Sequence, residues 1–174
     1  MKVNFLNPFV SSAHEILSLE LGEDVQRGEL CLENGSYETD DVTVIISLIG
    51  AVDGTVFFSM SAESAIKMAS VLMGEKFETL DRLAQSGIAE IGNVITGRAS
   101  MKLAQAGYEA NISTPSMIMG KGATISTLEY PRLVVPLNTS IGPMTIHLAL
   151  REGQQTNMKT PQIRAPKAFE TPEQ

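Results

Sequence analysis

The feature that most constrains this chain is residues 81–106, a long run that predicts a single helix. The run contains no proline, it is rich in residues that favour helices, and Gly107 follows where the helix would close. Such a helix buries one apolar face against the rest of the domain. We expect that face to carry the apolar residues that recur at spacings of three, seven and eleven: Leu80, Leu83, Ile91, Val94 and Met101.

A second set of residues occupies another face of the same helix. Ser86, Glu90, Asn93 and Gly97 recur at +4, +7 and +11, so their positions lie above one another. The pattern predicts a carboxylate and a carboxamide held side by side on a rigid rod.

Three glycines, at positions 87, 92 and 97, lie within this predicted helix. A glycine inside a helix costs about 1 kcal/mol relative to alanine. The helix therefore needs another surface to come close, and that surface is either its own sheet or a docking partner.

The composition excludes several classes of protein. With 174 residues, 43% of them hydrophobic, the chain can form one domain with a proper core. Its single cysteine, Cys31, excludes an internal disulfide and favours a buried, inert thiol, and no cluster of Cys and His indicates a metal site. A net charge of −7 argues against nucleic acid as a partner. No apolar run reaches membrane-spanning length or resembles a signal peptide, so we expect a cytoplasmic protein without membrane contact.

The remaining pattern indicates two more helices among strands. Asn7 and Pro8 suit the start of a helix that Gly22 ends, and Ser61 can cap another that Gly74 closes. Residues 1–6 are compatible with a strand or an extended arm. Strands are expected at residues 28–33, 41–49, 55–60, 108–113, 116–119, 123–129, 132–139 and 144–150.

The C-terminal part of the chain differs in composition from the rest. Residues 152–174 are polar, contain three prolines and have few large apolar side chains. We interpret residues 1–151 as a single domain and residues 152–174 as a flexible tail without its own core.

The spacing Ser86-x3-Glu90-x2-Asn93, followed by Pro115, resembles the signature of the CheC/CheX/FliY family of chemotaxis phosphatases. The first ten residues, MKVNFLNPFV, are similar to the start of CheX sequences, and the resemblance extends to about Arg151. It implies a CheC-like α+β fold with a central antiparallel sheet, three helices packed against it and an internal duplication. It also implies a homodimer formed by joining sheets, for which the region of Pro136 or residues 144–150 could provide the edge.

A trace of the duplication is visible in the sequence. A shift of 75 residues places Ser86, Glu90, Asn93 and Gly97 on Ser11, Glu15, Ser18 and Gly22. A serine cannot replace both the carbonyl and the NH2 group of an asparagine. We therefore interpret the first helix as a degenerate copy.

The resemblance also implies an activity, the hydrolysis of the aspartyl phosphate of a CheY-type response regulator. Asn93 would orient the attacking water, and Glu90 would pair with a lysine in the regulator's active site. Ser86, Gly97 and Pro115 would contact the partner. The protein would need no cofactor of its own, because the Mg²⁺ belongs to the regulator.

Other interpretations remain open. Ser86, Glu90 and Asn93 could be only the solvated face of an amphipathic helix. The same fold could also serve as an adaptor that binds a regulator without hydrolysing its phosphate, or carry a vestigial site on a protein that its tail recruits elsewhere. The two histidines, His14 and His147, lie at unrelated positions and are expected to be structural.

Overall fold

The computed structural model describes residues 3–127 and 130–153 of the chain. Among these residues it contains three helices and ten strands. The helices are α1 (Val3–Leu21), α2 (Ala62–Met73) and α3 (Arg82–Gln105). The strands are β1 (Gln26–Arg27), β2 (Cys31–Glu33), β3 (Ser36–Glu38), β4 (Val42–Gly50), β5 (Val52–Met60), β6 (Ala110–Ile112), β7 (Ser116–Met119), β8 (Thr124–Ser126), β9 (Arg132–Thr139) and β10 (Gly142–Glu152).

Two long hairpins form the centre of an antiparallel sheet. The hairpin β4–β5 and the hairpin β9–β10 meet through β5 and β10, giving the order β1-β9-β10-β5-β4-β6. The short strands β2 and β7 extend the two borders by pairing with β9 and β4. The dense β-branched sequence of β4 suits this central position, because such side chains pack well on a pleated surface.

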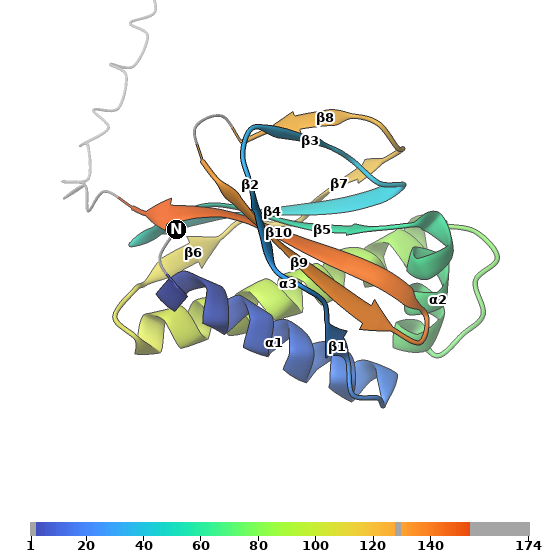
Figure 1. Cartoon of the computed structure of the whole chain (residues 1–174). Coiled ribbons are helices and arrows are strands. Elements are labelled where there is room, and N and C mark those ends of the chain that lie inside the picture. The colour runs from blue at the N-terminus through green and yellow to red at the C-terminus, as the bar shows by residue number, and fades with distance from the viewer. Residues whose placement is uncertain (1–2, 128–129, 154–174) are drawn as a thin grey trace, which may run out of the picture.

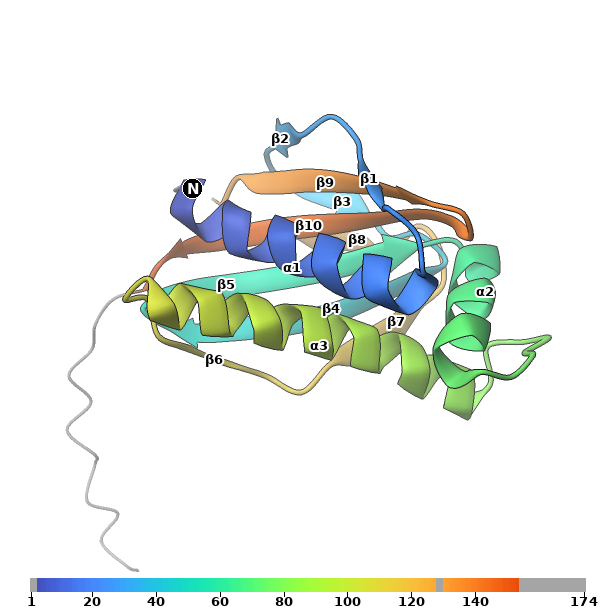
Figure 2. The same cartoon turned by 90° about the horizontal axis from the view of Figure 1, so that it is seen from below.

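The helices cover one face of this sheet. Figures 1 and 2 show α1 and α3 side by side beneath it, with α2 at one end, while β3 and β8 form a small ribbon above the other face. The core between helices and sheet includes Phe5 and Phe9 of α1, Phe58 of β5 and Ile88 and Ile95 of α3. The expected α+β fold, with three helices against a central antiparallel sheet, is therefore confirmed.

Strand pairing reveals the internal duplication. Five strands follow α1 and five follow α3, and the pairing of β1 and β2 with β9 repeats in the pairing of β6 and β7 with β4. The pairs β3–β8 and β5–β10 each join equivalent strands. The 75-residue shift does not fit this arrangement, since β2 begins at Cys31 and its equivalent β7 begins 85 residues later at Ser116. Gly22 follows the end of α1, whereas Gly97 lies inside α3.

Two further expectations, the start of the first helix and the burial of Cys31, were wrong. The first helix begins at Val3 and continues through Pro8, because Phe5 and Phe9 are four residues apart and both fully buried on one face. Cys31 is exposed, since β2 lies at the border of the sheet and is exposed along its length.

Residues 144–150 are not an edge, because β10 pairs with β5 on one side and β9 on the other. Pro136 is not a free edge either, since its carbonyl accepts a hydrogen bond from the Gly28 N–H at 2.8 Å. The borders of the sheet are instead formed by β1 and β2 on one side and β6 and β7 on the other.

The predicted tail begins at the end of β10. Glu152 is the last residue of that strand, and the Gly153 N–H donates a hydrogen bond to the Ala51 carbonyl at 2.9 Å. The rest of the predicted tail lies outside the described residues.

Candidate functional site

The helix α3 starts at a well-formed cap. The Asp81 side chain accepts hydrogen bonds from the backbone N–H groups of Leu83 and Ala84 at 3.0 and 2.9 Å. These bonds satisfy donors that have no partner in the first helical turn. The helix is thereby fixed from its first residue, which holds the polar residues farther along it in register.

Glu90 and Asn93 lie next to each other on the outer face of α3. Glu90 is exposed and Asn93 is half-buried, and the Asn93 Nδ2 donates to the Glu90 Oε2 at 3.4 Å. Because the amide nitrogen faces the carboxylate, the amide oxygen is left to accept a hydrogen bond from water or from a partner. The arrangement provides one negative charge and one neutral acceptor on a rigid helix.

The other three predicted site residues have different surroundings. Ser86 is exposed, but its hydroxyl donates to the Arg82 carbonyl at 2.9 Å within the helix. Gly97 lies on the exposed face of α3 beside Ile112 of β6. Pro115 is half-buried in the connection between β6 and β7, which Figure 2 shows running along α3. The structure thus brings Ser86, Glu90, Asn93 and Gly97 onto one face, with Pro115 in the neighbouring segment.

The prediction for the inward face of this helix was wrong at three positions. Leu83, Val94 and Met101 are 46%, 40% and 61% exposed, whereas Ile91 is buried and Leu80 packs against the core. The inward face is built largely from small and β-branched residues: Ala84, Gly87, Ile88, Ile91, Gly92, Ile95, Thr96, Ala99 and Leu103. Three large apolar side chains therefore lie on the same face as Glu90. Their spacing of 4, 7 or 11 residues from Glu90 was the sequence signal for this placement.

The three glycine positions of α3 differ in how closely neighbouring groups approach them. A Cβ on Gly92 would lie 3.2 Å from Phe58 and Val44, and a Cβ on Gly87 would lie 3.3 Å from the Met73 side chain of α2. Both glycines let α3 pack closely within the domain. A Cβ on Gly97 would meet its nearest neighbour, Ile112 Cδ1, at an ordinary 3.8 Å. Close packing within the described part of the chain therefore does not account for glycine at position 97.

Glu15 of α1, the acid that the 75-residue shift pairs with Glu90, is engaged within the protein. Lys102 of α3 donates to the Glu15 carboxylate at 2.6 Å and to the Ser11 hydroxyl at 2.9 Å. The hydrogen bond from Lys102 lowers the pKa of Glu15 below its usual value. These contacts join the two helices, and they occupy the two α1 side chains that the 75-residue shift paired with Ser86 and Glu90.

His147 belongs to a structural cluster beneath the β3–β8 ribbon. It is 8% exposed, it accepts a hydrogen bond from Arg132 Nε at Nδ1, 3.1 Å away, and its ring stacks on Tyr37. Burial, with the charge of Arg132 as a second cause, lowers the pKa of His147 to about 4. Arg132 also pairs with Glu33. The other histidine, His14, is exposed and contacts Asp24 at 3.0 Å.

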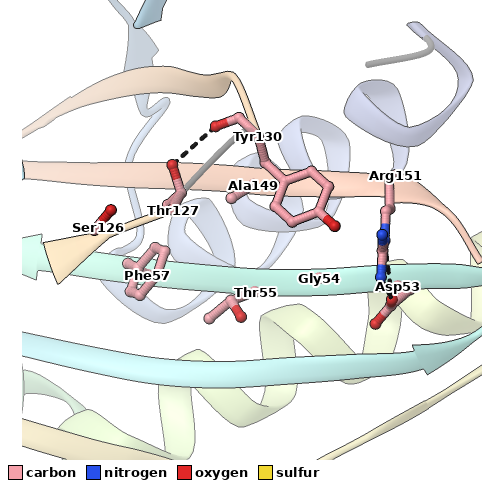
Figure 3. Close-up of a pocket in the computed structure, with 9 residues that line it drawn as sticks. All are labelled: Asp53, Gly54, Thr55, Phe57, Ser126, Thr127, Tyr130, Ala149 and Arg151. Atoms are coloured by element: carbon pink, nitrogen blue, oxygen red, sulfur yellow. Dashed lines mark hydrogen bonds and ion pairs between the residues drawn. The ribbon is translucent and has the colours of Figure 1, made fainter. Parts of the chain in front are cut away.

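A separate pocket of about 240 Å³ lies on the sheet face opposite α3. Figure 3 shows Arg151 and Asp53 joined at one end and Tyr130 above the strands, with the Thr127 hydroxyl donating to the Tyr130 carbonyl. Arg151 also lies 4.7 Å from the centre of the Tyr130 ring. The charges of Arg151 and Asp53 neutralise each other. Because the pocket lies on the other side of the sheet from α3, it is not part of the Glu90–Asn93 site.

The described residues offer neither a metal site nor a membrane-spanning helix. Residues 3–127 and 130–153 contain no group of three or more His, Cys, Asp or Glu side chains arranged to hold a metal ion. Within that same part of the chain, no helix is both long and apolar enough to cross a membrane.

Comparisons with known proteins agree on one family. The profile described as "Chemotaxis phosphatase CheX" matches residues 42–138. The CheY-P phosphatase CheX of Thermotoga maritima is 27% identical over 155 residues, which cover 88% of this chain and 99% of that protein.

Solved structures of CheC-like and CheX proteins also resemble this chain over most of its length. A CheC-like superfamily protein from Shewanella sp. PV-4 has a TM-score of 0.78 at 25% identity, over 87% of this chain and 99% of its own. A CheX–CheY–BeF3–Mg²⁺ complex from Borrelia burgdorferi has a TM-score of 0.74 at 26% identity, over 87% of this chain and 100% of the matched one.

Proposed function

Because this chain belongs to the CheX family of chemotaxis phosphatases, we propose that it hydrolyses the aspartyl phosphate of a CheY-type response regulator through Glu90 and Asn93. The observation that carries the proposal is the pair itself, an exposed acid and a half-buried amide 3.4 Å apart on the outer face of α3. The relative from Thermotoga maritima is a CheY-P phosphatase, and the relative from Borrelia burgdorferi forms a complex with CheY, BeF3 and Mg²⁺.

Asn93 supplies the group that orients water. Its amide oxygen accepts a hydrogen bond from a water molecule and directs the water oxygen at the phosphorus. The water oxygen forms the new bond to phosphorus and the bond to the aspartate oxygen breaks. Inorganic phosphate leaves, the regulator regains its carboxylate, and the proton of the water passes to the phosphate or to solvent. Mg²⁺ held by the regulator neutralises the charge on the phosphoryl oxygens.

Glu90 supplies the charge that fixes the position of the regulator. It is exposed and has no cationic partner among the described residues of its own chain, so it can pair with a lysine of the regulator beside the phosphate. Ser86 and Gly97 lie on the same face of α3 and line the approach, with Pro115 beside it. A homodimer joined through a border of the sheet, β1 and β2 or β6 and β7, fits the outer sides of these strands, which pair with no other strand among the described residues.

The test measures loss of the phosphoryl group from a phosphorylated CheY-type regulator in the presence of Mg²⁺. The wild-type chain should accelerate this loss, and Asn93→Ala should reduce the acceleration by at least about 100-fold. Asn138→Ala removes an exposed asparagine from β9 and serves as the matched control. If the chain binds the phosphorylated regulator without accelerating the loss, the adaptor function replaces the proposal. If Asn93→Ala accelerates the loss as much as wild type does, the chain is a phosphatase whose activity does not depend on Asn93, and the catalytic assignment of Asn93 is wrong.

A further inference from the structure

Four large apolar side chains are exposed around the Glu90–Asn93 pair. They are Met73 of α2 and Leu83, Val94 and Met101 of α3, and each exposes at least 40% of its surface. We refer to these four residues as the apolar strip. Isolated exposed apolar side chains are common on protein surfaces, but a group of them along one helix indicates an interaction surface.

The strip has a defined position relative to the two polar residues. With 3.6 residues per turn, Gly87, Val94 and Met101 form one row along α3, and Leu83, Glu90 and Gly97 form the next row. Met73 packs over Gly87, where a Cβ would lie 3.3 Å from its side chain, so Met73 occupies the start of the first row. Met73, Val94 and Met101 therefore flank Glu90 on one side, and Leu83 lies in the same row as Glu90, two turns before it.

Asn93 lies on the opposite side of Glu90 from the row of Gly87, Val94 and Met101. It is seven residues from Ser100, whose hydroxyl donates to the Ala110 carbonyl of β6 at 2.7 Å, so the row that contains Asn93 faces β6. The outer face of α3 is thus divided into a polar side toward β6 and an apolar side toward α2 at its start and α1 farther along. Glu90 stands between them.

The size of a typical protein interface indicates that the regulator itself covers the strip. A specific interface occupies about 800 Å² on each partner, which corresponds to a circle of radius about 16 Å. At about 1.5 Å per residue along a helix, Leu83, Val94 and Met101 all lie within about 15 Å of Asn93. An interface of this size centred on Asn93 therefore covers these three residues. It also reaches Met73, which packs over Gly87, about 9 Å from Asn93 along the helix.

We propose that the apolar strip of Met73, Leu83, Val94 and Met101 binds an apolar surface beside the phosphorylation site of the regulator and determines which regulators are dephosphorylated. The strip makes no contact with the reacting atoms, so its residues act on binding and selectivity. Two of the four are methionines, whose flexible thioether side chains adapt to the shape of a partner. This inference rests on the proposed function, because it places the same regulator over the same helix.

The experiment compares Met73→Gln and Met101→Gln with wild type. Glutamine has nearly the length of methionine and favours helices, so the fold should be retained, and a thermal melt checks this. The exposed Leu32 of β2 lies at the opposite border of the sheet from β6 and β7. Because β2 is also a candidate dimer border, Leu32→Gln is the matched control once gel filtration has shown that it keeps the oligomeric state of wild type. The dephosphorylation rate is measured against regulator concentration for at least two different CheY-type regulators.

We expect each strip variant to raise KM about 5-fold to 10-fold with kcat changed less than 2-fold, and to change the ratio of kcat/KM between the regulators. Leu32→Gln should leave both constants unchanged. The inference is overturned if KM and the ratio stay at their wild-type values in both variants, or if kcat falls while KM does not. If Asn93→Ala is fully active, the proposed function fails first. A loss of activity in Asn93→Ala together with unchanged strip variants rejects only the present inference.

Discussion

Asn93 Nδ2 and Glu90 Oε2 lie 3.4 Å apart on the outer face of α3, with the amide as donor and the carboxylate as acceptor. One turn of helix separates the two residues, so no other part of the chain is needed to bring them together. The contact directs the amide oxygen of Asn93 away from the carboxylate. A partner that binds Glu90 finds the neighbouring amide already oriented.

Replacing Glu90 by glutamine removes the negative charge of this residue and keeps its shape. Glu90→Gln can still accept a hydrogen bond from Asn93, but it cannot form an ion pair with a lysine of the regulator. We expect KM to rise about 10-fold, the equivalent of about 1.4 kcal/mol, with a smaller change in kcat. Steady-state kinetics at low and high salt measure this, because KM of the wild type should rise with salt and that of the variant should change less. A salt dependence identical to that of the wild type would contradict the charge role of Glu90.

Two alanine substitutions in α3 should have opposite effects on stability. Gly97→Ala meets only an ordinary contact with Ile112, so it should stabilise the helix by up to about 1 kcal/mol. Gly92→Ala places a Cβ 3.2 Å from Phe58 and Val44, so it should destabilise the protein by about 1–3 kcal/mol. Urea denaturation measures both effects.

Gly97→Ala should also reduce dephosphorylation although it stabilises the fold, because its Cβ stands where the regulator approaches the helix. The same kinetic assay tests this with the stability measured in parallel. A stabilised variant with wild-type kcat/KM would show that the regulator does not come close at position 97.

The cap of α3 should contribute measurably to stability. Asp81→Ala removes both side-chain hydrogen bonds to the first turn and should lower the free energy of unfolding by about 1 kcal/mol. Asp81→Asn retains an acceptor oxygen and should recover most of the loss. Chemical denaturation of the two variants checks the prediction, and equal losses would mean that the charge matters rather than the hydrogen bonds.

Stability should decrease in mild acid because of His147. Its pKa is about 4 in the folded protein and about 6.5 when the chain is unfolded, so the unfolded state binds more protons between these values. The contribution of the neutral His147 to the free energy of unfolding is fully present above pH 6.5 and is lost as the pH falls toward 4. At pH 5 the loss should be about 2 kcal/mol relative to pH 7.

Urea denaturation at pH 7 and pH 5 measures this difference in wild type and in His147→Asn. Asparagine places an oxygen near the position of Nδ1, so it can still accept from Arg132 but does not titrate in this range. The variant should lose less stability between the two pH values than wild type, and His14→Asn is the matched control. An unchanged difference in His147→Asn would assign the acid sensitivity to other groups.

Local sequence determined much of this protein. The helix at residues 81–106, the cap at Ser61, the strands of the β4–β5 hairpin and the placement of Glu90 beside Asn93 all depend on neighbours within a few residues. Such features depend on helix and strand periodicity alone, so the sequence was sufficient to predict them.

Tertiary packing decided which faces are buried. Large apolar residues occur on the outer face of α3, and its inner face contains Ala84, Gly87, Gly92 and Ala99 because the helix lies close to the sheet and to α2. A prediction from hydrophobicity alone therefore assigned Leu83, Val94 and Met101 to the buried face, which was wrong. Likewise, only burial of Phe5 with Phe9 shows that the first helix extends across Pro8, and only strand pairing shows that β10 is central. These features depend on contacts between segments far apart in the chain, which a local pattern cannot contain.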